Sequence, residues 1–228
     1  MNMPEIQNLP VHVSFIMDGN GRWARERGEE RVKGHVEGVR SVRVITEQAV
    51  RYGIPYVSFF AFSEENWGRP QSEVDALMAL MMKSVREEVK TLMDNDVRFV
   101  VLGNRERLSA PLRAAISSLE EMTAGNKATT MVVFLSYSGK WDISQAARRM
   151  AEAGDDDLEK YLVTSGIPDP DLIVRTSGEM RISNYLLWQA AYSEFLFVDT
   201  LWPDFREDQF RAALEEFAKR DRRYGKVK

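Results

Sequence analysis

Short apolar segments alternate with longer amphipathic segments along this chain. The short segments are rich in β-branched and aromatic residues and are almost continuously apolar. That pattern is typical of strands covered on both faces, and therefore of a parallel sheet. We predict six strands, over Val11–Met17, Tyr56–Phe62, Val97–Leu102, Thr130–Tyr137, Asp171–Arg175 and Phe195–Asp199.

Between these strands, apolar residues recur at helical spacing. The first helical stripe runs from Val36 to Tyr52, and Gly53 follows it at the position of a C-cap. The second begins at Ser72, a predicted N-cap, and its apolar stripe continues to Leu92. Further helices are predicted over Arg105–Met122, Ile143–Ala151 and Glu207–Lys219. The alternation predicts an α/β fold: a single α/β/α layered domain over residues 1–228, with a mainly parallel sheet of about six strands.

Composition narrows the class of protein. The chain has 228 residues and no cysteine, which excludes disulfides, a thiolate nucleophile and cysteine-ligated metals. Its net charge is −4, whereas a nucleic-acid binder carries an excess of basic residues, so no nucleic-acid partner is expected. We see neither a signal peptide nor an apolar run of the ~18 residues that span a membrane, and expect a cytoplasmic protein.

Unusual polar residues follow three of the predicted strands, where open parallel sheets bind their ligands. Asp18–Trp23 combines a carboxylate with two glycines and Arg22, which suits a phosphate, and an ordinary glycine-rich turn is the alternative. Ser63–Pro70 offers hydrogen-bonding groups and Trp67 to cover an apolar chain, although this tryptophan could instead be buried in a turn. Arg175–Asn184 offers arginines and hydroxyls for a second diphosphate, or for surface ion pairs with Glu179.

The second helix also carries a run of methionines, Met78, Met81, Met82 and Met93. Methionine is adaptable and suits the wall of an apolar tunnel between helices and sheet, but filling the core is its commoner role.

Four segments together resemble the cis-prenyltransferase family. They are His12–Ala24, Phe62–Pro70, Asp171–Asn184 and Leu201–Phe205, and the resemblance extends from about His12 to Gly225. It implies condensation of isopentenyl diphosphate onto an allylic diphosphate, here farnesyl diphosphate, with formation of a cis double bond. The implied product is undecaprenyl diphosphate, precursor of the cell-wall lipid carrier, and the implied cofactor is Mg²⁺.

The resemblance also implies a role for each matching residue. Asp18 would be the catalytic aspartate that positions Mg²⁺, with Glu194 as a second metal-associated carboxylate. His35, Ser63, Asn66 and Trp67 would shape the reacting centre. The proton acceptor stays open between His35, Ser63 and the released diphosphate. The allylic diphosphate would be held by Gly19, Asn20, Gly21, Arg22, Trp23, Arg31 and Arg69, and that of isopentenyl diphosphate by Arg175, Arg181 and Ser183.

A homodimer is implied as well, with a flexible N-terminus over residues 1–10 and a tail over residues 220–228. In that tail Arg223, within Arg-Tyr-Gly, would reach the partner's site. Peripheral membrane contact would serve product release. Two departures from the family pattern affect loops: Ser177 stands at a usual glycine, and Ser136–Gly139 reads Ser-Tyr-Ser-Gly in place of Asn-Tyr-Gly-Gly.

Three other functions were weighed. A trans-prenyltransferase would carry Asp-Asp-x-x-Asp motifs, whereas the only acidic run, Asp155–Asp157, lacks that spacing and reads as helix capping. A non-catalytic partner subunit would lose the aspartate, but Asp18 is present. A nucleotide hydrolase would carry a Walker lysine motif, and none occurs.

Overall fold

One parallel sheet organises the protein, whose structure is a computed structural model describing residues 6–222. Its six strands lie in the order β3-β4-β2-β1-β5-β6, and every described pairing is parallel. The predicted α/β fold and all six strands are confirmed, with ends that differ by at most two residues. The strands are β1 His12–Ile16, β2 Tyr56–Ser63, β3 Val97–Leu102, β4 Thr129–Tyr137, β5 Leu172–Arg175 and β6 Glu194–Phe197.

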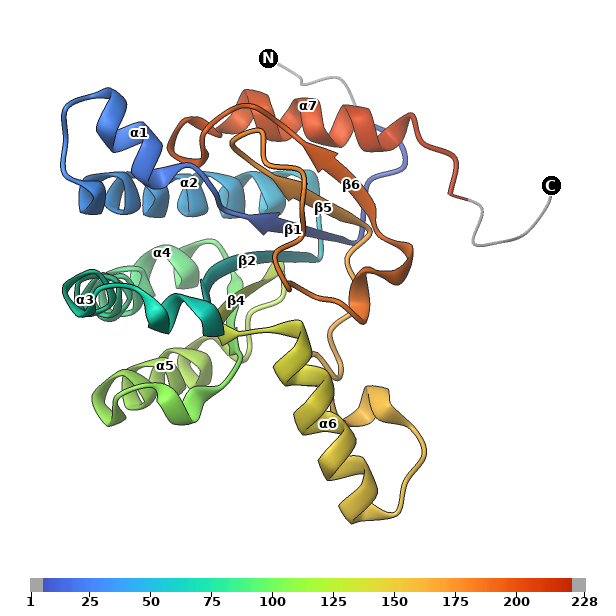
Figure 1. Ribbon diagram of the computed structural model, residues 1–228. Helices are drawn as coiled ribbons and strands as arrows, with labels where there is room; N and C mark the ends of the chain where they lie inside the picture. Colours follow the sequence, from blue (N-terminus) through green and yellow to red (C-terminus); the bar gives the residue numbers. More distant parts are fainter. Residues whose placement is uncertain (1–5, 223–228) are drawn as a thin grey trace.

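Helices cover both faces of this sheet (Figure 1). On one face, α2 and α7 pack on β1 and β2 around Phe15 and Phe59, while α3, α4 and α5 pack on β3 and β4. On the other face, α6 and the segment around Tyr185 pack on Ile16 and Phe134. The helices are α1 Asn20–Glu26, α2 Arg31–Tyr52, α3 Gln71–Glu87, α4 Val89–Asp94, α5 Ala110–Thr123, α6 Gly139–Ala153 and α7 Glu207–Ala218.

The order of the strands makes β1 the point where the sheet changes direction. The chain leaves β1 for β2, β3 and β4 on one side, and returns to β5 and β6 on the other. Open α/β sheets bind ligands at such a point, beyond the carboxyl ends of the strands. The residues after β1, β2 and β5 therefore meet at one rim of the sheet.

Several helix boundaries differ from the prediction. The helix predicted from Ser72 begins one residue earlier, after Pro70, and the side chain of Ser72 is not its cap. That helix also breaks at Glu88, which separates α3 from α4. The helix predicted from Arg105 is a 3-10 turn followed by α5, where Ser109 is the true N-cap. Gly53 does cap α2 in the left-handed conformation, with φ 67°.

The acidic run after α6 forms a capped turn, in agreement with the sequence interpretation. Asp157 accepts a hydrogen bond from the backbone N–H of Glu159, and Asp155 pairs with Lys160. Among the helices that the structure describes, none combines the length and the apolar character needed to cross a bilayer.

Candidate active site

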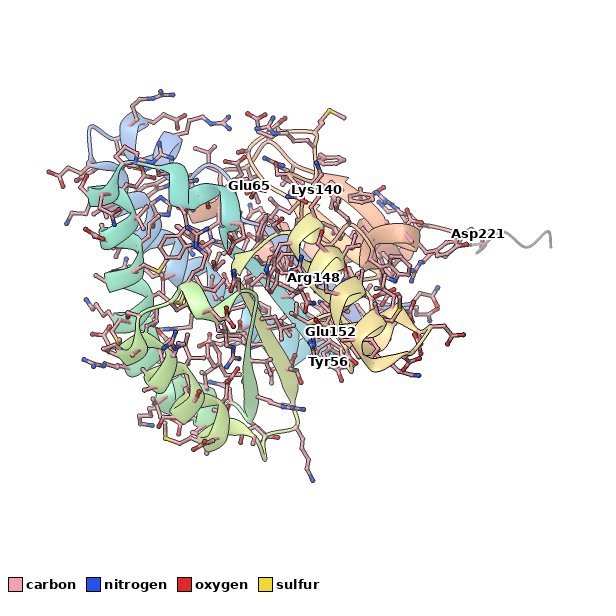
Figure 2. All side chains as sticks on the ribbon, turned by 60° about the horizontal axis from the view of Figure 1, so that its bottom comes forward. Tyr56, Glu65, Lys140, Arg148, Glu152 and Asp221 are labelled. Atoms are coloured by element: carbon pink, nitrogen blue, oxygen red, sulfur yellow. The ribbon has the colours of Figure 1, made fainter. Side chains whose placement is uncertain are left out.

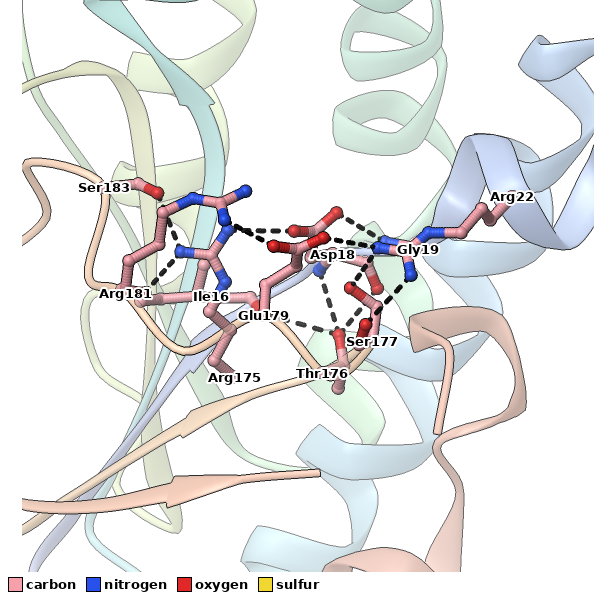
Figure 3. Close-up of polar contacts among 10 residues, drawn as sticks. All are labelled: Ile16, Asp18, Gly19, Arg22, Arg175, Thr176, Ser177, Glu179, Arg181 and Ser183. Carbon is pink, nitrogen blue, oxygen red and sulfur yellow. Dashed lines mark hydrogen bonds and ion pairs between the residues drawn. The ribbon is translucent and has the colours of Figure 1, made fainter. Parts of the chain in front are cut away.

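The loop after β1 carries the central carboxylate of the rim. Asp18 Oδ1 accepts the backbone N–H of Gly19 at 2.7 Å, and Asp18 Oδ2 accepts Arg175 Nη2 at 2.9 Å (Figure 3). Thr176 fixes the backbone of the same residue, because its hydroxyl hydrogen-bonds both the N–H and the carbonyl of Asp18. The side chain of Asp18 is 33% exposed, whereas that of Arg175 is 5% exposed. The carboxylate is thus held in place while part of it faces the cavity.

Arg175 in turn connects Asp18 to the loop after β5. Its Nη1 donates to the Ser183 hydroxyl at 2.7 Å and to the carbonyl of Arg181, and Figure 3 shows both bonds. The buried Nε of Arg175 has no partner among the described residues. Asp18, Arg175, Arg181 and Ser183 therefore form one cluster, as the sequence interpretation required.

A basic hollow of about 510 Å³ opens beside Asp18, between α1 and the start of α2. The N-cap of α1, Gly19, needs to be glycine there, because its φ is 102° and a Cβ would lie 2.8 Å from the Leu201 side chain. Cations surround this hollow, and an anion fits their charge. Its lining includes Gly19, Asn20, Gly21, Arg22, Arg25, Arg31, His35 and Arg69.

A second cavity, of about 450 Å³, continues from the same rim into the protein. Asp18, Arg175, Arg181 and Ser183 stand at its polar end, together with Asn20, His35, Ser63, Asn66 and Arg69. Farther in, its walls are apolar side chains from α2, α3 and the sheet, including Met78 and Met81. The tunnel predicted between helices and sheet is therefore present, and two of the methionines line it.

Ser63 and Asn66 hold the loop after β2 by a reciprocal cap. The Ser63 hydroxyl accepts the N–H of Asn66 at 3.2 Å, and the Asn66 side-chain oxygen accepts the N–H of Ser63 at 3.1 Å. This cap begins the 3-10 turn η1, Glu64–Gly68, which carries the chain towards α3. Both side chains thus shape the rim as well as line the cavity.

His35 is kept neutral by its surroundings. Burial, together with the nearby cations Arg69 and Arg31, lowers its pKa to about 4, against a smaller opposite effect of Glu73. Its Nε2 is buried and has no hydrogen-bond partner among the described residues. A neutral imidazole with a vacant ring nitrogen, beside two cations, can hydrogen-bond a bound ligand without adding charge.

Two carboxylates at this site were not predicted to belong to it. Glu73 pairs with Arg69 at 2.9 Å and with Arg31 at 3.1 Å, and Glu179 pairs with Arg22 and Arg181. The ion pairs with Glu179, which the sequence left as an alternative, are thus present. Because Glu73 lies in the first turn of α3, its acidic character looked like ordinary helix capping. The signal in the sequence that could have identified Glu73 as a site residue is its position three residues after the Arg69-Pro70 turn.

Some predicted site residues lie elsewhere. Trp67 does not line either cavity: its indole N–H donates to Ser136 at 2.8 Å, and its partly buried ring packs on Phe62. Trp23 faces away as well, with its indole N–H on Asp204 at 2.7 Å. Arg223 lies outside the described residues.

Glu194 lies apart from Asp18 within the chain. It begins β6, opposite Leu172, whereas Asp18 follows the other end of β1. Glu194 is level with Val13 of β1, and Asp18 lies five residues beyond Val13, which is up to roughly 16 Å at about 3.3 Å per residue. Glu194 instead pairs with Arg220 at 2.9 Å. It therefore does not join Asp18 in a metal site within one chain.

The two departures from the family pattern share one physical basis. Ser177 has φ 77° and Ser136 has φ 54°, so both adopt the left-handed conformation that glycine or asparagine tolerates best. Ser177 gains a hydrogen bond in exchange, since Arg22 Nη2 donates to its hydroxyl at 2.9 Å. Neither serine displaces a proposed ligand.

Asn184 joins the loops after β2, β4 and β5. Its side-chain N–H groups donate to Glu65 at 2.6 Å and to Ser138 at 2.8 Å, and its side-chain oxygen accepts the N–H of Lys140 at 3.0 Å. Glu65 and Lys140 accordingly lie at the same rim in Figure 2. This junction fixes the segment that carries Ser183.

The donor set suits Mg²⁺ bound jointly with a substrate. Within residues 6–222, no group of three or more histidine, aspartate or glutamate side chains could hold a metal alone. Mg²⁺ commonly takes one or two carboxylates, several waters and substrate phosphate oxygens. Asp18, partly exposed beside the basic hollow, can supply that carboxylate.

Comparisons with known proteins agree with this geometry. The family model described as "Putative undecaprenyl diphosphate synthase" matches residues 16–225. An isoprenyl transferase of Chlorobaculum tepidum is 48% identical over 96% of this chain and 87% of its own. A Shewanella oneidensis relative, 45% identical over 98% of this chain and 86% of its own, is named a (2E,6E)-farnesyl-diphosphate-specific ditrans,polycis-undecaprenyl-diphosphate synthase.

Solved structures share the fold over almost the whole chain. Lavandulyl diphosphate synthase from Lavandula x intermedia, in complex with dimethylallyl diphosphate, superposes with a TM-score of 0.92 and 36% identity over 96% of this chain and 99% of its own. A probable undecaprenyl diphosphate synthase from Campylobacter jejuni gives 0.83 and 31% identity over 96% of this chain and all of its own.

Proposed function

Because this chain belongs to the undecaprenyl diphosphate synthase family, we propose that it condenses isopentenyl diphosphate onto farnesyl diphosphate and lengthens the chain to undecaprenyl diphosphate. The observation that carries the proposal is the junction at Asp18. There a basic hollow, a second group of cations and an apolar cavity meet at one rim.

The two groups of cations divide the substrates between them. Arg22, Arg31 and Arg69, with the backbone of Gly19–Arg22, hold the allylic diphosphate in the basic hollow, with its prenyl chain in the apolar cavity. Arg175, Arg181 and Ser183 hold the diphosphate of isopentenyl diphosphate. Arginine forks match phosphate oxygens, and Glu73 and Glu179 keep several of these forks in position before the substrates arrive.

Mg²⁺ bound at Asp18 would supply positive charge that stabilises the departing allylic diphosphate. The chain's own contribution is orientation: the two substrates lie on either side of Asp18, so that the isopentenyl double bond faces the allylic carbon. Fixed cations also stabilise the charge that develops on the leaving group. The apolar walls exclude water from the growing chain, a gain of about 0.8 kcal/mol per CH₂ group.

The departing diphosphate is the proton acceptor that this site favours. In the substrate-free site His35 is a weak base, because burial and the neighbouring Arg69 and Arg31 lower its pKa to about 4. Its vacant Nε2 then positions the substrate by a hydrogen bond. Loss of the proton leaves the new double bond, and Ser63 and Asn66 keep the reacting segment in the cis geometry.

A homodimer, a cytoplasmic location and peripheral membrane contact complete the proposal. The edge strand β6 adjoins two exposed aromatic side chains, Trp188 at 41% and Tyr192 at 65%, which suits contact with a second copy. Arg223, which lies outside the described residues, would reach the partner's site. Substrates with charged diphosphates suit an aqueous compartment, whereas a long polyprenyl product suits release at a membrane surface.

The test is an assay with farnesyl diphosphate, radiolabelled isopentenyl diphosphate and Mg²⁺, followed by chromatography beside polyprenol standards. Asp18→Asn keeps the shape of the side chain but removes its charge, so turnover should fall by about 100-fold or more. Asp94→Asn removes an exposed carboxylate whose ion-pair partner among the described residues is Lys90, and it should match the wild type. A wild-type protein that incorporates no label would reject the function, and an active Asp18→Asn enzyme would reject the role of Asp18.

A further inference from the structure

An ion pair lies in the wall of the apolar cavity, away from the reacting rim. Arg43 of α2 and Glu88, between α3 and α4, both line this cavity. The guanidinium contacts the carboxylate with two nitrogens, Nε to Oε2 at 3.1 Å and Nη2 to Oε1. Because α2 runs beside α3, this fork fastens two walls of the cavity to each other (Figure 1).

The position along α2 places this pair well inside the cavity. The α2 residues that line it run from His35, at the polar end, to Glu47. Arg43 follows His35 by eight residues, which is roughly 12 Å along a helix axis at about 1.5 Å per residue. A prenyl chain that grows inward from the rim would reach this depth.

Glu88 lies at the junction of two helices that form its wall of the cavity. It is the only residue between α3, which ends at Glu87, and α4, which begins at Val89. Residues from both sides of the break line the cavity, among them Met81 and Leu92. A change in the angle between the two helices would therefore change the space at the inner end.

That space is small for the proposed product. A cavity of roughly 150 Å³ takes a benzene ring, so about 450 Å³ takes roughly 18 carbon atoms. This is close to the size of a farnesyl chain and far below that of an undecaprenyl chain. Since protein interiors are closely packed, the walls must separate as the chain grows.

We propose that the Arg43–Glu88 ion pair is a latch that limits product length by holding α2 against the α3–α4 break. The side chain of Arg43 is 48% exposed and that of Glu88 18%, so water reaches the pair and makes it weak enough to open. A short prenyl chain leaves the latch closed. Each further unit presses on the walls until the latch opens or the product leaves.

The proposal rests on the proposed function, and its test measures product length with farnesyl diphosphate and radiolabelled isopentenyl diphosphate. Arg43→Met keeps most of the side-chain length without the charge, and Glu88→Gln keeps the shape. Both should move the distribution towards longer chains, by about one isoprene unit or more. The double exchange Arg43→Glu with Glu88→Arg rebuilds the pair and should move it back.

Arg40→Met is the matched control. Arg40 lies on the same helix and loses the same charge, but its partner Glu37 is also on α2 and neither residue lines the cavity. Its products should keep the wild-type length. Unchanged or shorter products from Arg43→Met and Glu88→Gln, with circular dichroism like that of the wild type, would overturn the latch. A wild type without any polyprenyl product would instead reject the proposed function.

Discussion

Acid should destabilise the folded protein mainly through its two histidines. Burial lowers the pKa of His12 to about 4, partly offset by the Pro168 carbonyl and Asp171, and burial with Arg69 and Arg31 lowers that of His35 to about 4. In the unfolded chain both should titrate near the ordinary value of 6.5. Between these values the unfolded state binds protons that the folded state does not, so stability falls as pH falls from about 6.5 towards 4.

The structure of the His12 site explains why its imidazole ring stays neutral near pH 5. The Nδ1–H of His12 donates to the Pro168 carbonyl at 2.7 Å, and Nε2 lies 2.8 Å from the Ser58 hydroxyl. The Ser58 hydroxyl in turn donates to Ser14 at 2.8 Å, in a buried chain that continues to Tyr185. The His12 ring is 1% exposed, so water cannot hydrate the positive charge that a proton would bring.

The expected effect follows from the pKa difference. At about 1.36 kcal/mol per unit, each histidine accounts for a loss of about 2 kcal/mol between pH 7 and pH 5. Urea unfolding at both pH values and constant ionic strength should show a total loss of about 4 kcal/mol. His35→Asn should remove about half of this pH dependence, whatever it does to stability at pH 7. A loss below about 1 kcal/mol in the wild type, or the full loss in His35→Asn, would refute the reasoning.

Three further changes test other parts of the site. Arg181→Ala should raise the KM for isopentenyl diphosphate by about 10-fold or more, with little change in the KM for farnesyl diphosphate. Initial-rate kinetics with each substrate varied in turn measure both constants. If the two sites are assigned the wrong way round, the KM for farnesyl diphosphate will rise instead. Gly34→Ala would place a Cβ 1.9 Å from the carbonyl oxygen of Asn20, so it should lower stability by about 3 kcal/mol or more, and an unchanged Tm would contradict the packing of α1 on α2. Ser177→Gly should relieve the strain of the left-handed conformation at φ 77° and raise stability by up to about 1 kcal/mol. The hydrogen bond lost from Arg22 reduces this gain. A clear fall in Tm would show that the lost hydrogen bond outweighs the relieved strain.

The sequence predicted the sheet well because strands buried on both faces need long apolar runs, and those runs are visible without any knowledge of pairing. It also predicted the rim, since residues that follow parallel strands meet at one edge. It failed at Glu88, because the apolar stripe continues across the break and nothing local marks the bend.

The assignment of individual side chains was less successful for a related reason. Trp67 and Trp23 stand beside site residues in the sequence, but their indole groups are directed to Ser136 and Asp204. Glu194 directly precedes the predicted sixth strand, Phe195–Asp199, and only the pairing of the strands shows that it lies at the end of the sheet opposite Asp18. Glu73 joins the site through two arginines from other segments, a contact that spacing does not reveal.

The position of β1, where the sheet changes direction, has a consequence for how such an enzyme can diversify. The residues proposed to hold the allylic diphosphate precede β3 in the chain, whereas those proposed to hold isopentenyl diphosphate begin at Arg175, the last residue of β5. Selection can therefore alter the preference for one substrate through one half of the chain and leave recognition of the other intact. Asp18 adjoins both halves, so an enzyme that changes its preference for either substrate must still keep Asp18.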